Sequence, residues 1–254
     1  MFDERFEINA LSKSTLTYSE HVVRYQFASR FVQSKVVLDI ACGSGYGSQI
    51  LALAGAAQVI GVDIDKQAID LANSKNQSKN INYINSDATK LNLGNESIDV
   101  IVSFETIEHL KNPEEYLKEL KRVLKVDGIA LISTPNLEVS KNHNPFHIKE
   151  YTKDEFTRLL QGSFQESSIL DQFNVLTSVI KTDYTNPGEF DIIKDIPNPE
   201  YFIAICAKKE LKMVLGKSIA SLNKDALEKL RSNPGLKIAD TIYSFLTKIK
   251  LIKN

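Results

Sequence analysis

The chain has 254 residues, of which 43% are hydrophobic and 25% charged, and its formal net charge is −1. This is typical of one globular domain with room for a small appendage, and it gives no overall attraction to nucleic acid or anionic lipid. The first residues lack the apolar core of a signal peptide, and no apolar run reaches the roughly 18 residues of a membrane span, so we expect a cytoplasmic protein.

Apolar strand-like runs alternate with helical patterns along most of the chain. A helical segment at 19–31 comes first, and further helices are predicted at 48–54, 66–75 and 113–123. Thr152 and Glu155 form a capping box that predicts the start of another helix. The predicted strands are 36–40, 59–63, 81–85, 98–104, 129–133, 167–173 and 201–207. This order predicts an α/β domain over residues 1–210, with a Rossmann-like, doubly wound, mostly parallel seven-stranded sheet and helices on both faces.

A turn of small residues follows the first predicted strand, which ends around Asp39. Ala41, Gly43, Gly45 and Gly47 carry little or no side chain, so the backbone there can approach a ligand closely. A turn between a strand and a helix N-terminus is where open parallel sheets bind nucleotide-like cofactors. The spacing differs from the dinucleotide pattern Gly-x-Gly-x-x-Gly, and an acidic residue before the turn suits a cationic ligand better than a pyrophosphate.

Two more acidic residues stand where later strands should end. Asp63 closes Val-Ile-Gly-Val-Asp, where its carboxylate can accept two hydrogen bonds from a ribose diol. Asp87 can accept from an adenine amino group, and the small neighbour Ala88 leaves room for the ring. The alternative interpretation is that Asp39, Asp63 and Asp87 are all ordinary turn residues at strand ends.

The ordered motifs resemble those of class I S-adenosylmethionine-dependent methyltransferases, from about residue 20 to 208. They are Leu-Asp-Ile-Ala-Cys-Gly-Ser-Gly, Gly-Val-Asp-Ile-Asp, Ser-Asp-Ala, Ser-Phe-Glu-Thr-Ile-Glu-His and Ser-Thr-Pro-Asn. Ala41 stands where the family usually has its first glycine. The resemblance implies S-adenosylmethionine as cofactor and a binding set of Asp39, Ala41, Cys42, Gly43, Gly45, Asp63, Ile64, Asp87 and Ala88.

An acidic and imidazole cluster follows the fourth predicted strand. Glu105, Glu108 and His109 stand at i, i+3 and i+4, offsets that share one face of a helical turn. We expect this face at the edge of the sheet where the transferable methyl group lies. A sugar hydroxyl is a poor acid, so its methylation needs a histidine base or a divalent cation.

The pattern Glu-x-x-Glu-His also resembles the metal site of the small-RNA 2′-O-methyltransferases and the ubiquinone-pathway O-methyltransferases. In the RNA group a further histidine follows the Ser-Thr-Pro-Asn strand, and His147 stands in a comparable place here. This resemblance implies Mg²⁺ or Mn²⁺ bound by Glu105, Glu108, His109 and His147. Metal-free family members share the Glu-His pair, so the alternative is direct catalysis by His109, Glu108 and His147.

Segments 20–28, 144–151 and 201–206 resemble bacterial methyltransferases of cell-surface polysaccharide synthesis. They imply O-methylation of a sugar hydroxyl on a glycan, nucleotide sugar or lipid-linked saccharide, with Arg24 and Tyr25 closing over the methionine end of the cofactor. The alternatives are a small catechol, a quinone precursor or RNA ribose as acceptor, and a non-catalytic scaffold module. The core lacks a concentrated basic stripe and the overall charge is slightly acidic, so we expect no nucleic-acid partner.

Residues 211–254 form a basic C-terminal extension with helical spacing of apolar residues, split at Pro234-Gly235. We expect two amphipathic helices that pack on the domain or on each other. The alternative is a surface for a partner, a glycosyltransferase module or an anionic membrane face, which would make the protein peripheral at the inner side of the membrane. The polar segment 182–199 is long enough to be a lid or a binding insertion.

Overall fold

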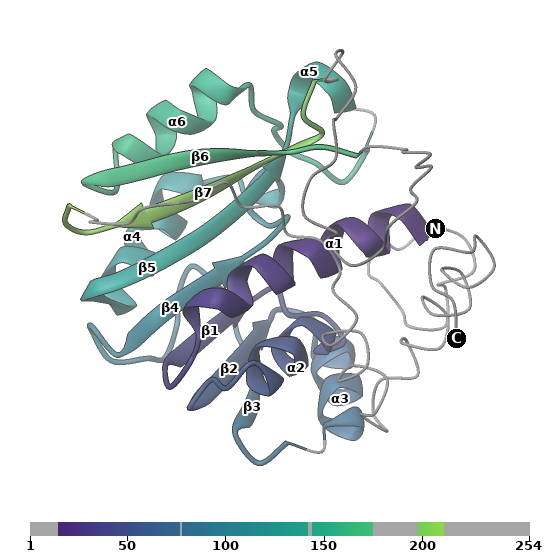
Figure 1. The fold of residues 1–254 in the computed structure, drawn as a ribbon, viewed down its shortest axis with the longest axis vertical. Helices are drawn as coiled ribbons and strands as arrows, with labels where there is room; N and C mark the ends of the chain where they lie inside the picture. The colour runs from purple at the N-terminus through teal and green to yellow at the C-terminus, as the bar shows by residue number, and fades with distance from the viewer. Residues whose placement is uncertain (1–14, 77, 142–143, 175–197, 211–254) are drawn as a thin grey trace, which may run out of the picture.

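The computed structural model describes residues 15–76, 78–141, 144–174 and 198–210 (Figure 1). The predicted C-terminal extension lies outside the described residues, as does the 182–199 segment except for its last two residues. None of the helices within the described ranges combines the length and apolar character that a bilayer crossing requires.

Seven strands form one sheet in the order β3-β2-β1-β4-β5-β7-β6. Strands β1 to β5 run parallel, whereas β7 is antiparallel to both of its neighbours. Their bounds are β1 Val36–Ile40, β2 Gln58–Asp63, β3 Ile81–Asn85, β4 Ile98–Ser103, β5 Leu124–Pro135, β6 Glu166–Gln172 and β7 Tyr201–Ala207. The predicted mostly parallel, doubly wound sheet is therefore confirmed.

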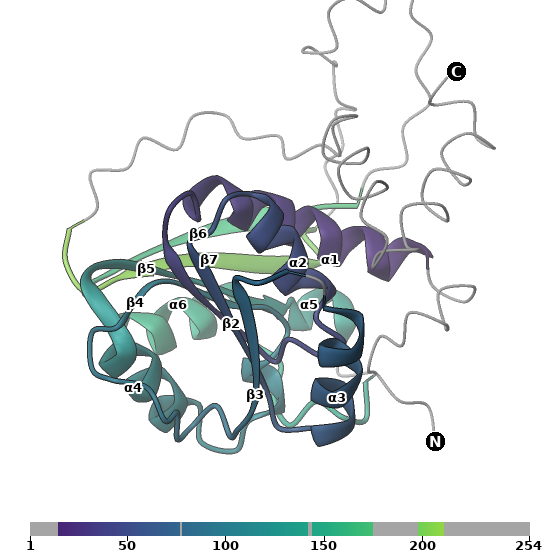
Figure 2. The same ribbon diagram turned by 90° about the horizontal axis from the view of Figure 1, so that it is seen from below.

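Helices cover both faces of the sheet (Figure 2). They are α1 Thr15–Ala28, α2 Tyr46–Leu53, α3 Lys66–Lys75, α4 Pro113–Val123, α5 Leu137–Ser140 and α6 Lys153–Gln161, with 3-10 turns η2 Ser29–Phe31 and η3 Ile107–His109. Apolar residues of α1, α2 and α3 pack with Val37 of β1, and those of α4 and α6 pack with Leu38 and Ile40. Because strand side chains alternate, Asp39 faces the same side as Val37, toward α1 and α2.

Several boundaries differ from the sequence-based prediction, those of α2 and β5 among them. Helix α2 begins at Tyr46, earlier than the expected 48, because Gly45 has a left-handed φ of 81° and serves directly as the N-cap. Strand β5 extends well beyond 129–133, since it pairs with β4 at Leu124 and with β7 as far as Pro135. The predicted capping box of α6 is present, with reciprocal hydrogen bonds between Thr152 and Glu155.

The carboxyl ends of β1, β2 and β3 lie on one side of β4, to which the chain then returns. The carboxyl edge between the neighbouring strands β1 and β4 is thus a topological switch point, the place where open α/β sheets form a ligand crevice. The loops that follow β1, β2, β3, β4 and β5 all lie at this edge of the sheet. The fold therefore gathers the residues singled out by the sequence at one end of the molecule.

The start of α1 is fastened to the ends of β6 and β7 near this edge. The Tyr201 hydroxyl donates to Glu20 Oε2 at 2.8 Å, and Gln172 Nε2 donates to the Glu20 carbonyl at 3.2 Å. The Asn174 N–H donates to Glu200 Oε2 at 2.9 Å, and the Glu200 N–H donates to the Gln172 carbonyl at 3.0 Å. Both ends of the β6–β7 connection are therefore held close to α1.

Candidate functional site

A fully buried carboxylate, Asp39, lies under the turn after β1. It accepts hydrogen bonds from the Ser48 hydroxyl at 2.6 Å and from the Tyr25 hydroxyl at 2.9 Å. Burial raises the pKa of Asp39 to about 7, although both hydrogen bonds act in the opposite direction. A cation placed nearby would stabilise the charged carboxylate, so this position suits a ligand ammonium group.

The glycines of the turn have different roles. A Cβ at Gly45 would lie 2.3 Å from the Tyr83 hydroxyl, and one at Gly47 would lie 2.0 Å from the Tyr25 ring. At these two positions the absent side chain makes room for a tyrosine, a packing role that the sequence analysis did not predict. A Cβ at Gly43, by contrast, would meet nothing within 4 Å, so its backbone borders open space. Gly43 is the position at which a ligand can approach most closely.

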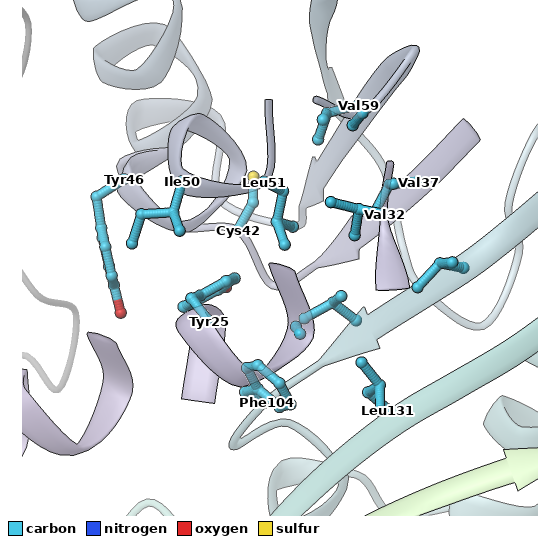
Figure 3. Packing of buried hydrophobic residues seen from close by; sticks show 14 of the residues in the cluster. Tyr25, Val32, Val37, Cys42, Tyr46, Ile50, Leu51, Val59, Phe104 and Leu131 are labelled. Atoms are coloured by element: carbon cyan, nitrogen blue, oxygen red, sulfur yellow. The ribbon is translucent and has the colours of Figure 1, made fainter. Parts of the chain in front are cut away.

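Ala41 and Cys42 point in opposite directions. Ala41 is exposed and has a left-handed φ of 54°. Glycine is the usual residue in this backbone conformation, and here alanine, with its small side chain, takes its place. The side chain of Cys42 is buried in the core cluster beside Leu51 (Figure 3), and burial raises its thiol pKa well above the ordinary value. Only the backbone of Cys42 therefore remains available to the predicted cofactor site.

Asp63 joins the turns after β1 and β2. Its Oδ2 accepts from the Gly43 N–H at 2.9 Å, and its Oδ1 accepts from the Asp65 N–H at 2.8 Å. A carboxylate can accept about four hydrogen bonds, which leaves capacity for a ligand diol. The next side chain, Ile64, is 75% exposed, so an apolar surface stands beside this carboxylate and is available to a flat ring.

Asp87 is also at the expected edge but is mostly engaged with its own turn. Its Oδ1 accepts from the Thr89 N–H at 2.8 Å and from the Thr89 hydroxyl at 2.7 Å, and these bonds lower its pKa. Ala88 is half-buried against the core. The alternative interpretation of Asp87 as a turn residue is thus supported, and it does not preclude a contact through Oδ2.

Arg24 is fully buried although it carries a charge. Its Nη1 donates to Gln172 Oε1 at 3.0 Å, its guanidinium stacks 4.3 Å from the Tyr201 ring centroid, and Glu105 Oε1 lies 4.0 Å away. Its Nε and Nη2 have no hydrogen-bond partner among the described residues. Leaving buried donors unsatisfied is costly, so this fork suits an anionic group of a ligand.

Tyr25 has a supporting role beside Arg24. Its ring packs edge-on against Tyr46 and Phe104 (Figure 3), with centroid distances of 5.6 and 5.2 Å. Its hydroxyl donates a hydrogen bond to Asp39. The expectation that Tyr25 closes over the ligand is therefore corrected, because its ring is buried beneath the turn.

Glu105 does not share a face with Glu108 and His109. It has a left-handed φ of 52° and precedes the helical turn, which begins only at Ile107. The Ser133 hydroxyl donates to Glu105 Oε1 at 2.6 Å, which holds this carboxylate beside Arg24. The predicted four-residue metal set is therefore reduced to three.

The remaining three residues form a compact cluster. One ligand atom each of Glu108, His109 and His147 lie within 4.8 Å of one another. Glu108 is fully buried, and its Oε1 has no hydrogen-bond partner in the part of the chain that the structure covers. Burial, and next the charge of Glu105, raise the pKa of Glu108 well above the ordinary value. A cation or a hydrogen-bond donor from a ligand would satisfy this carboxylate.

The loop that carries His147 is held against this cluster by backbone hydrogen bonds. The N–H groups of Ile148 and Lys149 donate to the Glu108 carbonyl at 2.8 and 3.1 Å. His109 Nδ1 lies 3.0 Å from the Phe146 carbonyl, which can only accept, so Nδ1 carries the proton and Nε2 the lone pair. Metal-binding histidines are commonly oriented in this way.

Several supporting residues were not predicted from the sequence. The Tyr83 hydroxyl donates to the Gly45 carbonyl at 3.0 Å, Ser133 fixes Glu105, and Glu150 lies against His147. Tyr83 occupies an inward position of β3, but an aromatic residue there has no distinctive sequence signal.

A family model described as a methyltransferase domain matches residues 38–132. A Mycobacterium tuberculosis protein named "Probable S-adenosylmethionine-dependent methyltransferase" is 35% identical over 148 residues, which are 56% of this chain and 53% of that protein. The chain thus spans about half the length of this relative.

A Coxiella burnetii ubiquinone biosynthesis O-methyltransferase is 36% identical over 107 residues, which are 41% of this chain and 45% of that protein. An S-adenosylmethionine-dependent methyltransferase structure from Archaeoglobus fulgidus aligns with TM-score 0.59 and 21% identity, covering 79% and 99% of the two chains.

Proposed function

The chain carries a class I S-adenosylmethionine-dependent methyltransferase domain, and from this premise we propose that it methylates a hydroxyl oxygen of its acceptor. S-adenosylmethionine supplies an electrophilic methyl group on a sulfonium. The acceptor oxygen would form its bond to this methyl carbon as the carbon–sulfur bond breaks, the neutral thioether S-adenosylhomocysteine would leave, and the hydroxyl proton would pass to the site. The observation that carries the proposal is the Glu108–His109–His147 cluster, which lies at the ligand edge of the sheet.

The donor-binding residues follow from the chemistry of the site. Asp39 would pair with the donor ammonium group, and Arg24 would receive its carboxylate on the unsatisfied fork. Asp63 would accept from the ribose hydroxyls, while Ile64 would cover one face of the adenine. Gly43 borders the space between them. The residues present therefore fit this donor.

The cluster would activate the acceptor hydroxyl. We propose that Glu108, His109 and His147 hold Mg²⁺ or Mn²⁺, which would lower the pKa of a coordinated hydroxyl. Two imidazoles and a carboxylate suit Mn²⁺ better than Mg²⁺, which prefers oxygen ligands, and the buried Oε1 of Glu108 would gain its missing partner. Without a cation, an imidazole Nε2 would take the proton directly.

Two acceptor classes are in question. The first is a sugar hydroxyl, which the polysaccharide-type segments of the sequence favour. The second is a phenol, because the C. burnetii relative is named for ubiquinone biosynthesis and because two apolar residues, Phe146 and Ile148, are 45% and 53% exposed on either side of His147. An apolar rim suits an aromatic or prenylated acceptor better than a free sugar.

The test is an acceptor panel with isotope-labelled S-adenosylmethionine. Nucleotide sugars, glycans, catechols and quinone precursors are incubated with the full chain, with and without a chelator, and products are identified by mass spectrometry. We expect an O-methylated product that is lost in Asp63→Ala together with donor binding, and lost in His109→Ala while calorimetric donor binding persists. Donor binding without turnover on any acceptor would instead support the scaffold alternative.

A further inference from the structure

His147 has a defined partner on each ring nitrogen. Its Nδ1 lies 2.6 Å from Glu150 Oε1, and its Nε2 lies 3.0 Å from Asn144 Nδ2. The orientation of the Asn144 amide is fixed independently, because its Oδ1 accepts from the Phe146 N–H at 3.0 Å. The atom facing Nε2 is therefore an amide nitrogen, which can only donate. His147 accordingly carries its proton on Nδ1 and its lone pair on Nε2.

The side chain of Glu150 is buried and is held in place by hydrogen bonds. It is 2% exposed, and its side chain in the His147 pair is fully buried. Its second oxygen accepts a hydrogen bond from Ser140 at the end of α5. The neighbouring Tyr151 is buried and its carbonyl accepts from the Leu137 N–H at 3.0 Å, so the backbone here is also tied to α5.

We infer that Glu150 is a positioning residue that holds His147 in the Nδ1–H tautomer and so leaves Nε2 as the lone-pair nitrogen of the histidine that clusters with Glu108 and His109. The Asn144 amide donates a neutral hydrogen bond to this nitrogen, which a cation or an acceptor hydroxyl can displace. This inference rests on the proposed function, since it assigns Glu150 a part in the same cluster.

The two imidazoles of the cluster are then unequal. His109 is oriented by the neutral carbonyl of Phe146, whereas His147 is oriented by a buried carboxylate. A carboxylate partner makes an imidazole a stronger electron donor than a carbonyl partner does. We therefore place the tighter cation ligand, or the stronger base, at His147.

The experiment records the tautomer directly, without activity. The full chain is labelled with [¹⁵N]histidine, and long-range ¹H–¹⁵N spectra are taken at pH 8, above the ordinary histidine pKa of about 6.5. His147→Asn assigns the resonances. We expect Nδ1–H in the wild type and in Glu150→Gln, whose amide oxygen still accepts, and a mixture of tautomers in Glu150→Ala. Ser140→Ala is the matched control, because it removes a partner of Glu150 and leaves the pair with His147 in place.

Mn²⁺ titration calorimetry on the same proteins gives a second readout. Removing a carboxylate that hydrogen-bonds a metal-binding histidine typically lowers metal affinity 10–100-fold. We expect this loss for Glu150→Ala and not for Ser140→Ala. A wild-type His147 protonated on Nε2, or an unchanged tautomer in a folded Glu150→Ala, would overturn the inference. If wild type binds no Mn²⁺ but shows the expected tautomer shift, the metal site fails while the positioning role of Glu150 stands.

Discussion

The Tyr25 hydroxyl donates a 2.9 Å hydrogen bond to Asp39, so a helix that precedes the sheet holds the carboxylate under the first turn. Together with Ser48 it fixes the orientation of this carboxylate, although burial disfavours its charge. A cation beside Asp39 would offset this cost of burial.

Asp39→Asn should change the pH dependence of stability. The pKa of Asp39 is raised from 3.8 to about 7, so between these values the folded state binds more protons than the unfolded state. The free energy of unfolding should then fall as pH rises from about 4 to 7, by at most about 4 kcal/mol. Urea denaturation of both proteins at pH 5 and 8 should show the asparagine variant relatively more stable at pH 8. A stability difference that is the same at both pH values would contradict the assignment.

Arg24→Met should separate donor recognition from folding. Removing the guanidinium relieves the unsatisfied Nε and Nη2 but gives up the bond to Gln172 and the contact with Glu105, so the free energy of unfolding should fall by only about 1–3 kcal/mol. Affinity for S-adenosylmethionine should fall at least about 10-fold, the scale of a lost charge-assisted pair. Decarboxylated S-adenosylmethionine is the informative comparison: wild type should prefer the intact donor, and Arg24→Met should bind both alike in calorimetry. Arg30→Met, on the exposed turn after α1, is the control. Equal discrimination by wild type and Arg24→Met would refute the carboxylate role.

Glu108→Gln and Glu105→Gln should differ in metal binding. Glu108 belongs to the three-residue cluster, and its neutral amide should weaken Mn²⁺ binding by at least about 10-fold, since it removes the anionic ligand of a cation site. Glu105 is held by Ser133 beside Arg24, so its amide should leave Mn²⁺ affinity nearly unchanged. Calorimetry with Mn²⁺ measures both, and EDTA should abolish turnover until Mn²⁺ is returned. A larger loss in Glu105→Gln would restore the four-residue set predicted from the sequence.

Gly45→Ala should mainly lower stability, whereas Gly43→Ala should mainly lower affinity for the donor. Both glycines have positive φ, which costs alanine about 1 kcal/mol, but only at Gly45 would the new Cβ collide with the Tyr83 ring. Gly45→Ala should therefore lose about 2–4 kcal/mol of stability in urea denaturation. Gly43→Ala should fold with a smaller loss and bind the donor at least about 10-fold more weakly, because its methyl group enters the open space. Normal donor affinity in Gly43→Ala would place the ligand elsewhere.

The sheet was predictable because its strands are short apolar runs with regular helical segments between them. Bounds such as Val36–Ile40 and Lys66–Lys75 match the prediction, since local pattern decides them. The start of α2 was missed because the positive φ of Gly45 depends on packing against Tyr83, a residue far along the chain.

The site was predictable where one residue follows one strand, as for Asp39 and Asp63. It was not predictable where the backbone departs from regular geometry. The i, i+3, i+4 rule requires a continuous helix, and the left-handed Glu105 interrupts it. Glu150 was missed because its contact with His147 depends on a loop that folds back onto the Glu108 carbonyl.

The connection between β6 and β7 leaves and re-enters the sheet at a clasp formed by Asn174 and Glu200, next to the first turns of α1. Because Glu20 of α1 accepts from both Asn174 and Tyr201, this clasp ties the far edge of the sheet to the helix that carries Arg24 and Tyr25. A change at that edge would therefore move the two side chains that stand beside Glu105 and Asp39.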